Sequence, residues 1–496
     1  MTEQLTLDLV GMRDRVRQYA RDFGLDFFEV SFELLDYDQL NMVAAYGGFP
    51  TRYPHWKFGM EFEELQKTYS YGLSKIYELV INNDPCYAYL MKCNNLVDQK
   101  LVMAHVYAHS DFFKNNYWFS CTNRKMMDEI ANHGVRIRRY IERYGQQKVE
   151  EFIDCCLSLE NLIDGHSPYS LRQRKKREEE KQAEKDALQP TRLKAKSYME
   201  SFINPPTFLE EERQRIQQKL EEMKKFPENP EKDILLFLME NAQLERWQRD
   251  VLSIVREESY YFAPQGMTKI MNEGWASYWH SKIMTEKACT ADEIIDYADH
   301  HSATMATQPG SLNPYKLGIE LFRDIEERWN KGKFGSEWDD CDDAAAKYSW
   351  DKQLGLGRQK IFEVRKIYND VTFIDEFLTP EFAEKQKLFA YTYNKQTQEY
   401  VIETRDFKAV KEKLLFGLAN FGQPYIYVED GNYKNRGELY LIHRNDGYSL
   451  RPDHARDTME NLFKVWQRPV HLETVMEKRR KVMTFSGSKH EERIIK

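Results

Sequence analysis

The sequence predicts an α+β protein in which a mainly helical N-terminal core precedes a small α+β domain. Apolar residues recur at helical spacing through most of the first 330 residues, and a β-hairpin pattern between Tyr77 and Met91 interrupts them. From about residue 380 to residue 485 the pattern changes to the order β-β-α-β-β-α-β. With 496 residues, of which 41% are hydrophobic, the chain is long enough to bury a sizeable core.

These patterns divide the chain into four parts. Residues 1–167 form an N-terminal helical part with the hairpin, and residues 233–375 form a second helical part. Between them, residues 168–232 are dominated by charge and are expected to be a peripheral insertion, because a charged run is usually a solvated helix or a flexible segment. Residues 380–485 form the C-terminal α+β domain.

Each predicted element has a local signal. The first helix runs from about Leu9 to Phe23 and ends at Gly24, a residue type favoured at helix C-caps. The hairpin turns at residues 82–85, Asn-Asn-Asp-Pro, because these residue types favour turns. Asn94 or Asn95 can cap the helix that follows. The other expected elements before residue 330 are a strand in 27–36 and helices in 37–48, 123–144, 146–163 and 234–329.

The composition argues against several classes of protein. The net charge of −8 and the isoelectric point near 6.0 disfavour a general nucleic-acid-binding protein, which normally carries a basic excess. No apolar stretch reaches the roughly 18–20 residues that a membrane span requires, and the N-terminus has acids where a signal peptide would be basic. The seven cysteines form no Cys-x-x-Cys pair, which argues against a thiolate zinc site. We therefore expect a cytoplasmic protein that neither binds nucleic acid nor spans a membrane.

Two histidines on the helix after the hairpin are candidate metal ligands. His105 and His109 are four residues apart and therefore share one helix face. Two imidazoles at this spacing can reach one metal ion. Two histidines satisfied by hydrogen bonds inside a helical core are the alternative explanation.

The stretch MNEGWASYWH, residues 271–280, supplies a candidate third ligand. Glu273 and His280 lie close to two helical turns apart and share one face. A tetrahedral zinc site of two histidines and one glutamate needs the carboxylate that Glu273 can offer. His280 lies about 10 Å farther along the helix axis, which favours a position beside the ligands or the substrate. An ordinary helix packed by its aromatic residues is the alternative.

A family resemblance strengthens this assignment. Asn272–Tyr278, NEGWASY, resembles the N-E-G-F-A-x-Y segment of gluzincin aminopeptidases and the E-G-W-A-x-Y segment of other gluzincin-like peptidases. The resemblance implies a gluzincin-like N-terminal core and a zinc ion held by His105, His109 and Glu273. In those families an H-E-x-x-H motif places a general-base glutamate after the first histidine, and here that position is Val106. A hydrolase built on this chain would therefore need another base.

Glu258 is the first candidate for that base, because it precedes Glu273 on a segment expected to fold back beside the ligand helix. Glu257 and Asp111 are alternatives.

Other residues are expected around the ligands. Gluzincins stabilise the oxyanion with a downstream tyrosine or histidine, so the resemblance implies this role for Tyr315 or His301. His280 and Asp111 are expected to contact the ligand side chains without binding the metal themselves.

The sequence also resembles the SpoVR family, the stage V sporulation protein R group. The resemblance covers roughly residues 25–165 and 234–475. It is carried by the stretches AAYGGFPTRYPHWKFGMEFE, HVYAHSDFFKNN, NEGWASYWH, LNPYKLGIELFRDI and RPVHLETV. It implies a bacterial protein associated with spore-cortex formation, with a PrkA-type serine protein kinase and a von Willebrand-type protein as partners.

Two functions are open at this point. The first is a zinc-dependent hydrolase that cleaves an amide or peptide bond during cell-wall or spore-cortex formation, with water as the nucleophile. The second is a non-catalytic regulatory or scaffolding protein that acts with the PrkA-type kinase. The paired histidines and the NEGWASY segment favour the first function, whereas Val106 favours the second.

Overall fold

The computed structural model describes residues 5–70, 79–170, 210, 226–394, 396–476 and 478–495. Most of the predicted charged insertion, residues 168–232, lies outside the described residues. The contacts divide the chain into two compact units, each made of two segments: Met1–Arg143 with Tyr261–Gly422, and Tyr144–Tyr260 with Gln423–Lys496. The predicted α+β class is confirmed.

The first unit is mainly helical. Its first segment contains α1 (Leu7–Asp22), β1 (Val30–Leu35), α2 (Tyr37–Ala45), α3 (Trp56–Ser70), β2 (Leu79–Ile81), β3 (Cys86–Met91), α4 (Leu96–Asn115), the 3-10 turn η1 (Tyr117–Phe119) and α5 (Met126–Tyr144). Its second segment begins within α11 (Arg246–Met267) and contains α12 (Lys269–Ile283), the π-helical turn η2 (Met284–Ala288), α13 (Ile294–Thr304), α14 (Pro314–Lys331), α15 (Ser336–Asp339) and α16 (Ala344–Tyr348). It continues with α17 (Gly357–Ile367), α18 (Asp370–Phe377), α19 (Pro380–Lys385), β4 (Ala390–Asn394), β5 (Glu399–Thr404), α20 (Phe407–Leu418) and the turn η3 (Ala419–Gly422).

The predicted hairpin is confirmed and lies in a three-stranded sheet. β2 pairs antiparallel with β3, with Leu79 opposite Tyr89, and β1 pairs parallel with the other edge of β3. Residues 77 and 78 of the predicted hairpin lie outside the described residues. After β3 the chain turns directly into α4, whose N-cap is Asn95: its side chain accepts a hydrogen bond from Asp98 N at 2.7 Å. The hairpin therefore sets the position of the helix that carries the paired histidines.

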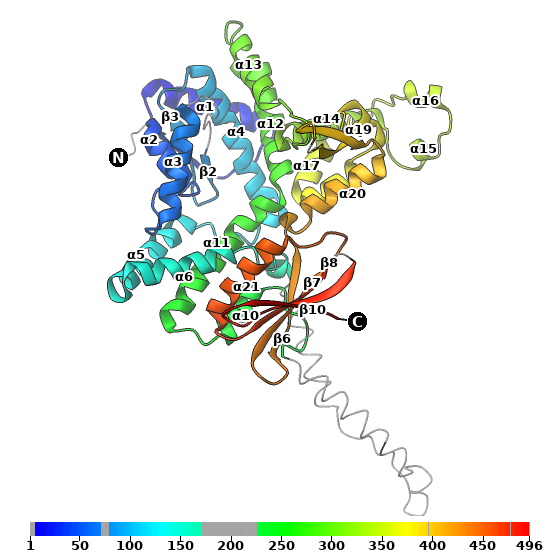
Figure 1. The fold of residues 1–496 in the computed structure, drawn as a ribbon. Helices are drawn as coiled ribbons and strands as arrows, with labels where there is room; N and C mark the ends of the chain where they lie inside the picture. The colour runs from blue at the N-terminus through cyan, green and yellow to red at the C-terminus, as the bar shows by residue number, and fades with distance from the viewer. Residues whose placement is uncertain are drawn as a thin grey trace, which may run out of the picture. The chain divides into compact units, whose positions relative to one another are not determined.

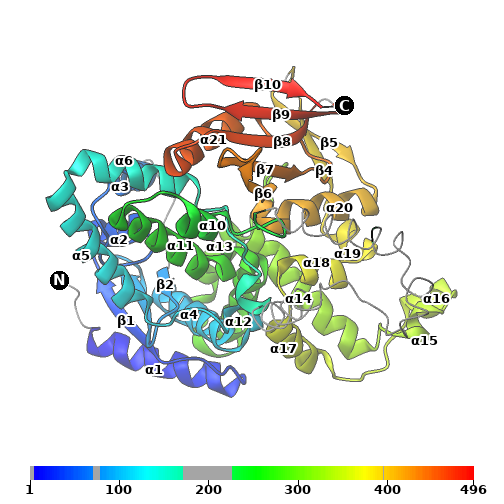
Figure 2. The same ribbon diagram turned by 90° about the horizontal axis from the view of Figure 1, so that it is seen from below.

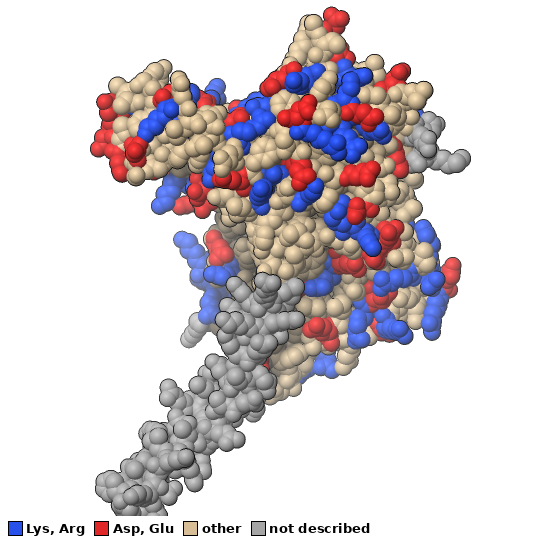
Figure 3. Space-filling view, turned by 180° about the vertical axis from the view of Figure 1, so that it is seen from behind, with Lys and Arg blue, Asp and Glu red and all other residues tan. Residues whose placement is uncertain are grey.

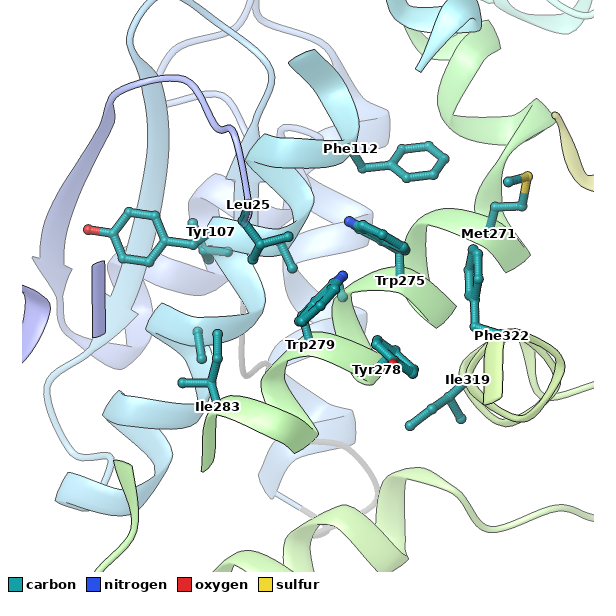
Figure 4. Close-up of a cluster of buried hydrophobic side chains, with 14 of the residues drawn as sticks. Leu25, Tyr107, Phe112, Met271, Trp275, Tyr278, Trp279, Ile283, Ile319 and Phe322 are labelled. Carbon is teal, nitrogen blue, oxygen red and sulfur yellow. The ribbon is translucent and has the colours of Figure 1, made fainter. Parts of the chain in front are cut away.

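Helix α12 lies in the middle of the first unit, beside α4 and α14 (Figure 1). Its aromatic side chains fill the space between these helices (Figure 4). The ring centroid of Trp275 is 5.5 Å from that of Trp279 and 5.3 Å from that of Phe322 on α14. All three side chains are fully buried. This aromatic core fixes α12 against both neighbours, because closely packed interiors leave little room for sliding.

The second unit combines helices with one sheet. Its elements are α6 (Gln146–Ser158), α10 (Ile234–Asn241), most of α11, β6 (Tyr425–Tyr433), β7 (Glu438–Arg444), α21 (Pro452–Trp466), β8 (Val470–Met476), β9 (Arg479–Phe485) and β10 (His490–Ile494). The strand order is β10-β9-β8-β7-β6; β7 and β8 are parallel and the other neighbours are antiparallel. Helix α21 makes the crossover between the parallel strands and packs on β8 and β9 (Figure 2).

The predicted order β-β-α-β-β-α-β is found from β4 to β8, and two further strands follow it. These strands do not form one sheet, because within the described ranges β4 and β5 pair only with each other. The contacts group β4, β5 and α20 with the first unit and the strands from β6 onwards with the second. The expected domain of residues 380–485 thus contains parts of both units.

No helix among the described residues is long and apolar enough to cross a membrane. On the face drawn in Figure 3, lysine and arginine side chains are interspersed with aspartate and glutamate side chains.

Candidate metal centre

The two histidines of α4 point to the same side of the helix and are almost completely buried. His105 is 2% exposed and His109 is 3% exposed, and their ring centroids are 4.5 Å apart. This proximity follows from the four-residue spacing, which stacks side chains one turn apart. The spacing predicted from the sequence therefore places both imidazoles at one point of the core.

Helix α12 brings Glu273 to these histidines, and its N-terminus is held by a residue from elsewhere in the chain. Thr268, the N-cap, makes no side-chain capping hydrogen bond. Instead Asp370, the first residue of α18, accepts hydrogen bonds from Ile270 N at 2.8 Å and Met271 N at 2.9 Å. Complete burial raises the pKa of the Asp370 carboxyl to about 7, against the lowering effect of these donors. Asp370, which is distant in the sequence, thus provides the hydrogen-bond acceptors that an N-cap side chain usually provides.

Gly274, the residue after Glu273, lets the backbones of α12 and α14 approach closely. A Cβ atom at Gly274 would lie 2.4 Å from Cα of Gly318, and one at Gly318 would lie 2.2 Å from the carbonyl oxygen of Ile270. No side chain fits at either position without moving a helix. The glycine thus fixes how closely α12 and α14 pack beside Glu273.

The carboxylate of Glu273 lies between the two imidazoles. Its Oε2 is 3.6 Å from Nε2 of His105 and 3.5 Å from Nε2 of His109, and the three ligand atoms lie within 4.8 Å of one another. This Oε2 atom is buried and accepts no hydrogen bond from the described residues. A tetrahedral zinc ion with bonds of about 2.05 Å holds its ligands about 3.3 Å apart. The spacing of the three groups therefore fits one such ion.

The Nδ1 atom of each imidazole, which does not face Glu273, lies within hydrogen-bond distance of another side chain. Nδ1 of His109 is 2.9 Å from Oδ1 of Asn272, and Nδ1 of His105 is 2.7 Å from Nδ1 of His280. An amide oxygen only accepts hydrogen bonds, so Nδ1 of His109 is the donor in this contact, and Nε2 is the nitrogen that faces Glu273. Such second contacts orient the histidine ligands of metal sites.

His280 and Tyr315 lie near His105, and His301 lies beside His280. Nε2 of His280 is 3.4 Å from Nδ1 of His301 on α13, and burial together with the charge of Arg323 lowers the pKa of His301. The ring of Tyr315, in the first turn of α14, is 6.4 Å from the ring of His105. The structure thus brings these three sequence-predicted residues near the candidate ligands.

Asp111 lies on α4 in a buried ion pair. Its Oδ2 accepts from Arg365 Nη1 at 2.6 Å and from Trp275 Nε1 at 2.8 Å, while its Oδ1 accepts from Asp26 N at 2.7 Å. Burial raises the pKa of Asp111 to about 6, although the charge of Arg365 opposes this rise. Through these contacts Asp111 connects α4 with α12 and α17. In the structure its carboxylate therefore holds helices together.

Two other positions bear on catalysis. Val106 is fully buried, so an apolar side chain occupies the position of the general base in H-E-x-x-H enzymes. Glu258 is 4% exposed and lies on the portion of α11 that belongs to the second unit. Within the described parts of the chain, no further histidine, cysteine or carboxylate joins the three candidate ligands.

Sequence reasoning missed three residues that shape the centre. Asn272 precedes Glu273 in the NEGWASY stretch, so its place in that motif was the available signal. Asp370 and Gly318 act on α12 from about 100 and 44 residues away, and no local pattern marks them.

Comparisons with known proteins agree over nearly the whole chain. Residues 3–423 match the family described as SpoVR like protein, and residues 424–477 match the SpoVR-like C-terminal domain. The Uncharacterized protein YcgB of Escherichia coli (strain K12) is 30% identical over 498 residues, which cover 93% of this chain and 90% of that protein. No solved structure matches. The chain belongs to the SpoVR family.

Proposed function

We propose that this protein binds one zinc ion through Nε2 of His105, Nε2 of His109 and the carboxylate of Glu273. The observation that carries the proposal is the pair of 3.6 and 3.5 Å distances from Glu273 Oε2 to the two imidazoles. A buried carboxylate oxygen without a hydrogen-bond donor is energetically costly, and Oε2 of Glu273 has no such donor among the described residues. Hydrogen bonds alone therefore do not explain this arrangement. A metal ion would satisfy all three groups at once.

Metal analysis of the purified full-length protein tests this proposal. We expect about one zinc per chain, a large loss of zinc in His105→Ala and Glu273→Gln, and an unchanged content in the control variant His454→Ala. His454 is exposed on α21, so its loss should not affect the centre. A wild-type protein without zinc, iron or manganese after gentle purification would contradict the proposal, and iron or manganese at full occupancy would replace zinc as the ion.

For the activity, we propose hydrolysis of an amide or peptide bond in cell-wall or spore-cortex formation. A bound zinc would supply Lewis-acid polarisation of a carbonyl group and activation of water. The chain must then supply a proton acceptor and an oxyanion donor. Glu258 remains the proposed base, and Tyr315 or His301 remains the proposed oxyanion donor. The NEGWASY resemblance to gluzincins supports this activity.

Release of new amino groups from purified peptidoglycan and from a quenched peptide library tests the activity. We expect turnover by wild type and none by Glu273→Gln. Glu258→Gln should abolish turnover while the zinc content stays unchanged, which separates a base from a ligand.

The second candidate is a regulatory or scaffolding function with a PrkA-type kinase and a von Willebrand-type protein. Buried Val106 favours it, because the usual base position cannot take a proton. If the zinc-loaded protein cleaves neither probe but co-purifies with the kinase from the same genome, the regulatory function replaces the hydrolase.

A further inference from the structure

The second unit contains a cavity that is separate from the candidate metal centre. Its volume is about 250 Å³, and it lies between the end of α10, the turn from β6 to β7 and the residues that follow α21. Its described lining residues are Phe226, Asn241, Ala242, Gln243, Gly431, Asn432, Gly437, Trp466 and Arg468. Drug-sized ligands occupy pockets of about 300–1,000 Å³, so this cavity suits a smaller molecule.

Arg468 gives the cavity its charge. It is the one charged residue among the described lining residues. The guanidinium group has no hydrogen-bond or ion-pair partner in the described parts of the chain. Five donors on a planar cation are best satisfied by an oxyanion, which takes two of them side by side. The cavity therefore favours an anionic group.

The guanidinium group lies against the backbone of the turn between β6 and β7. A Cβ atom at Gly437 would lie 1.7 Å from Nη1 of Arg468, so the group rests directly on the glycine backbone. Gly437 also has a φ of +67°, a conformation that glycine adopts at little cost. Its amide donates to Asn432 Oδ1 at 2.8 Å, and its carbonyl accepts from Trp466 Nε1 at 2.9 Å. The turn and the indole are thus joined by hydrogen bonds, and the guanidinium group of the exposed Arg468 lies against them.

The remaining walls are aromatic and amide groups. Phe237 lies behind the cavity and joins its two aromatic residues: its ring centroid is 5.5 Å from Phe226 and 5.7 Å from Trp466. Gln243 is exposed, and its side chain makes no hydrogen bond to the described residues. Its amide can donate to the same anion that Arg468 holds, while the rings cover a flat apolar body.

We propose that this cavity binds a small organic carboxylate with a flat apolar body. The carboxylate pairs with the guanidinium group of Arg468 and the amide of Gln243, and the apolar body packs on Trp466 and Phe226. This site is independent of the proposed zinc centre, because every residue of it belongs to the second unit.

Binding of 4-fluorobenzoate to the full-length protein, followed by fluorine NMR, tests the proposal. We expect a dissociation constant of about 1 mM or below, which is reasonable for a ligand of about ten heavy atoms. The uncharged 4-fluorobenzamide should bind at least about tenfold more weakly, because it lacks the charge-assisted hydrogen bonds. Equal binding of the two compounds, or no binding of the benzoate at tenfold higher concentration, would overturn the proposal.

Variants assign the binding to this cavity. Arg468→Gln should weaken benzoate binding about tenfold or more, and Arg468→Lys should restore part of it, because lysine keeps the charge without the planar fork. Gln243→Ala, at an exposed position that should not affect folding, should also weaken binding. The control Arg493→Gln, on β10 of the same sheet, should bind as wild type does. Unchanged binding in Arg468→Gln, or displacement of the benzoate by inorganic phosphate at lower concentration than by benzoate itself, would exclude the proposed ligand class.

Discussion

At the scale of single residues, the neighbours of the candidate ligands decide whether the imidazoles can bind a metal. A histidine binds through a nitrogen that carries no proton, and the hydrogen bond at its other nitrogen determines which one that is. Asn272 accepts from Nδ1 of His109, and His280 holds Nδ1 of His105. These two contacts direct both Nε2 atoms to Glu273. Asn272 is therefore as important to the geometry of the candidate centre as the position of Glu273 on its helix.

Replacement of Asn272 tests this role. Asn272→Leu leaves Nδ1 of His109 without its acceptor, so we expect zinc affinity to fall about 10- to 100-fold, the usual effect of losing an outer contact. Asn272→Asp keeps an acceptor of the same size and should retain affinity near that of wild type. Competition with a chelating dye measures the affinity, and circular dichroism checks the fold. Equal affinities for the two variants would show that the contact does not orient His109.

At the scale of elements, α12 is the helix on which the candidate centre depends. Its Asn272, Glu273 and His280 contact the histidines of α4. Its tryptophans Trp275 and Trp279 pack in the hydrophobic core (Figure 4). Its position is set at two points: Asp370 holds its N-terminus, and Gly274 lies against Gly318 of α14. A change at either point should move the carboxylate relative to α4, because packed helices shift as rigid bodies.

Gly274→Ala is therefore expected to lower both stability and zinc content. The added methyl group meets backbone atoms at 2.4 Å, and backbone cannot rotate away. We expect a loss of about 3 kcal/mol in the free energy of unfolding, at the upper end of the cost of overpacking.

Gly59→Ala is the matched control for this substitution. Gly59 also lies inside a helix, α3, but nothing lies within 4 Å of an added Cβ atom there. Because alanine has the higher helix propensity, this variant should gain about 0.5–1 kcal/mol. Urea denaturation measures both variants. A Gly274→Ala protein as stable as Gly59→Ala would contradict the close approach of α12 and α14.

At the scale of the whole molecule, each of the two units is built from two separate segments of the chain. The family matches change between residues 423 and 424, and the contacts change between Gly422 and Gln423. The strands that follow are nevertheless completed by an earlier segment. Helix α21 packs on α6, and Trp466 at its end stacks on Phe237 of α10 at 5.7 Å. The outer edge of β6 pairs with Glu231.

A fragment of residues 423–496 should therefore not fold alone. It keeps the sheet and α21 but loses α6, α10 and the cover of Trp466, and small chains bury too little surface to tolerate such losses. Co-expression with residues 144–260 should restore a folded complex. Proton–nitrogen NMR spectra measure both states: we expect narrow dispersion for the fragment and wide dispersion for the complex. A well-dispersed spectrum of the fragment alone would show that the sheet is an independent domain.

Local patterns in the sequence were sufficient to predict many of the elements and two of the three candidate ligands. Helix α4 follows from its cap at Asn95 and its apolar spacing, and the four-residue spacing of His105 and His109 determines that they share a face. The hairpin follows from the turn residues between its strands. The selection of Glu273 came from a motif resemblance, and the structure places its carboxylate beside both imidazoles.

Only the tertiary structure decided which distant groups complete these elements. Asp111 is a plausible base in the sequence, but folding pairs it with Arg365, 254 residues away. Strands β4 and β5 are predicted as strands from the sequence just as β6, β7 and β8 are, yet among the described residues they pair only with each other. The cap of α12 comes from Asp370 and its close contact from Gly318. The physical reason is that helical and strand periodicity acts over a few residues, whereas partners across the core are selected by packing and burial, which depend on the whole chain.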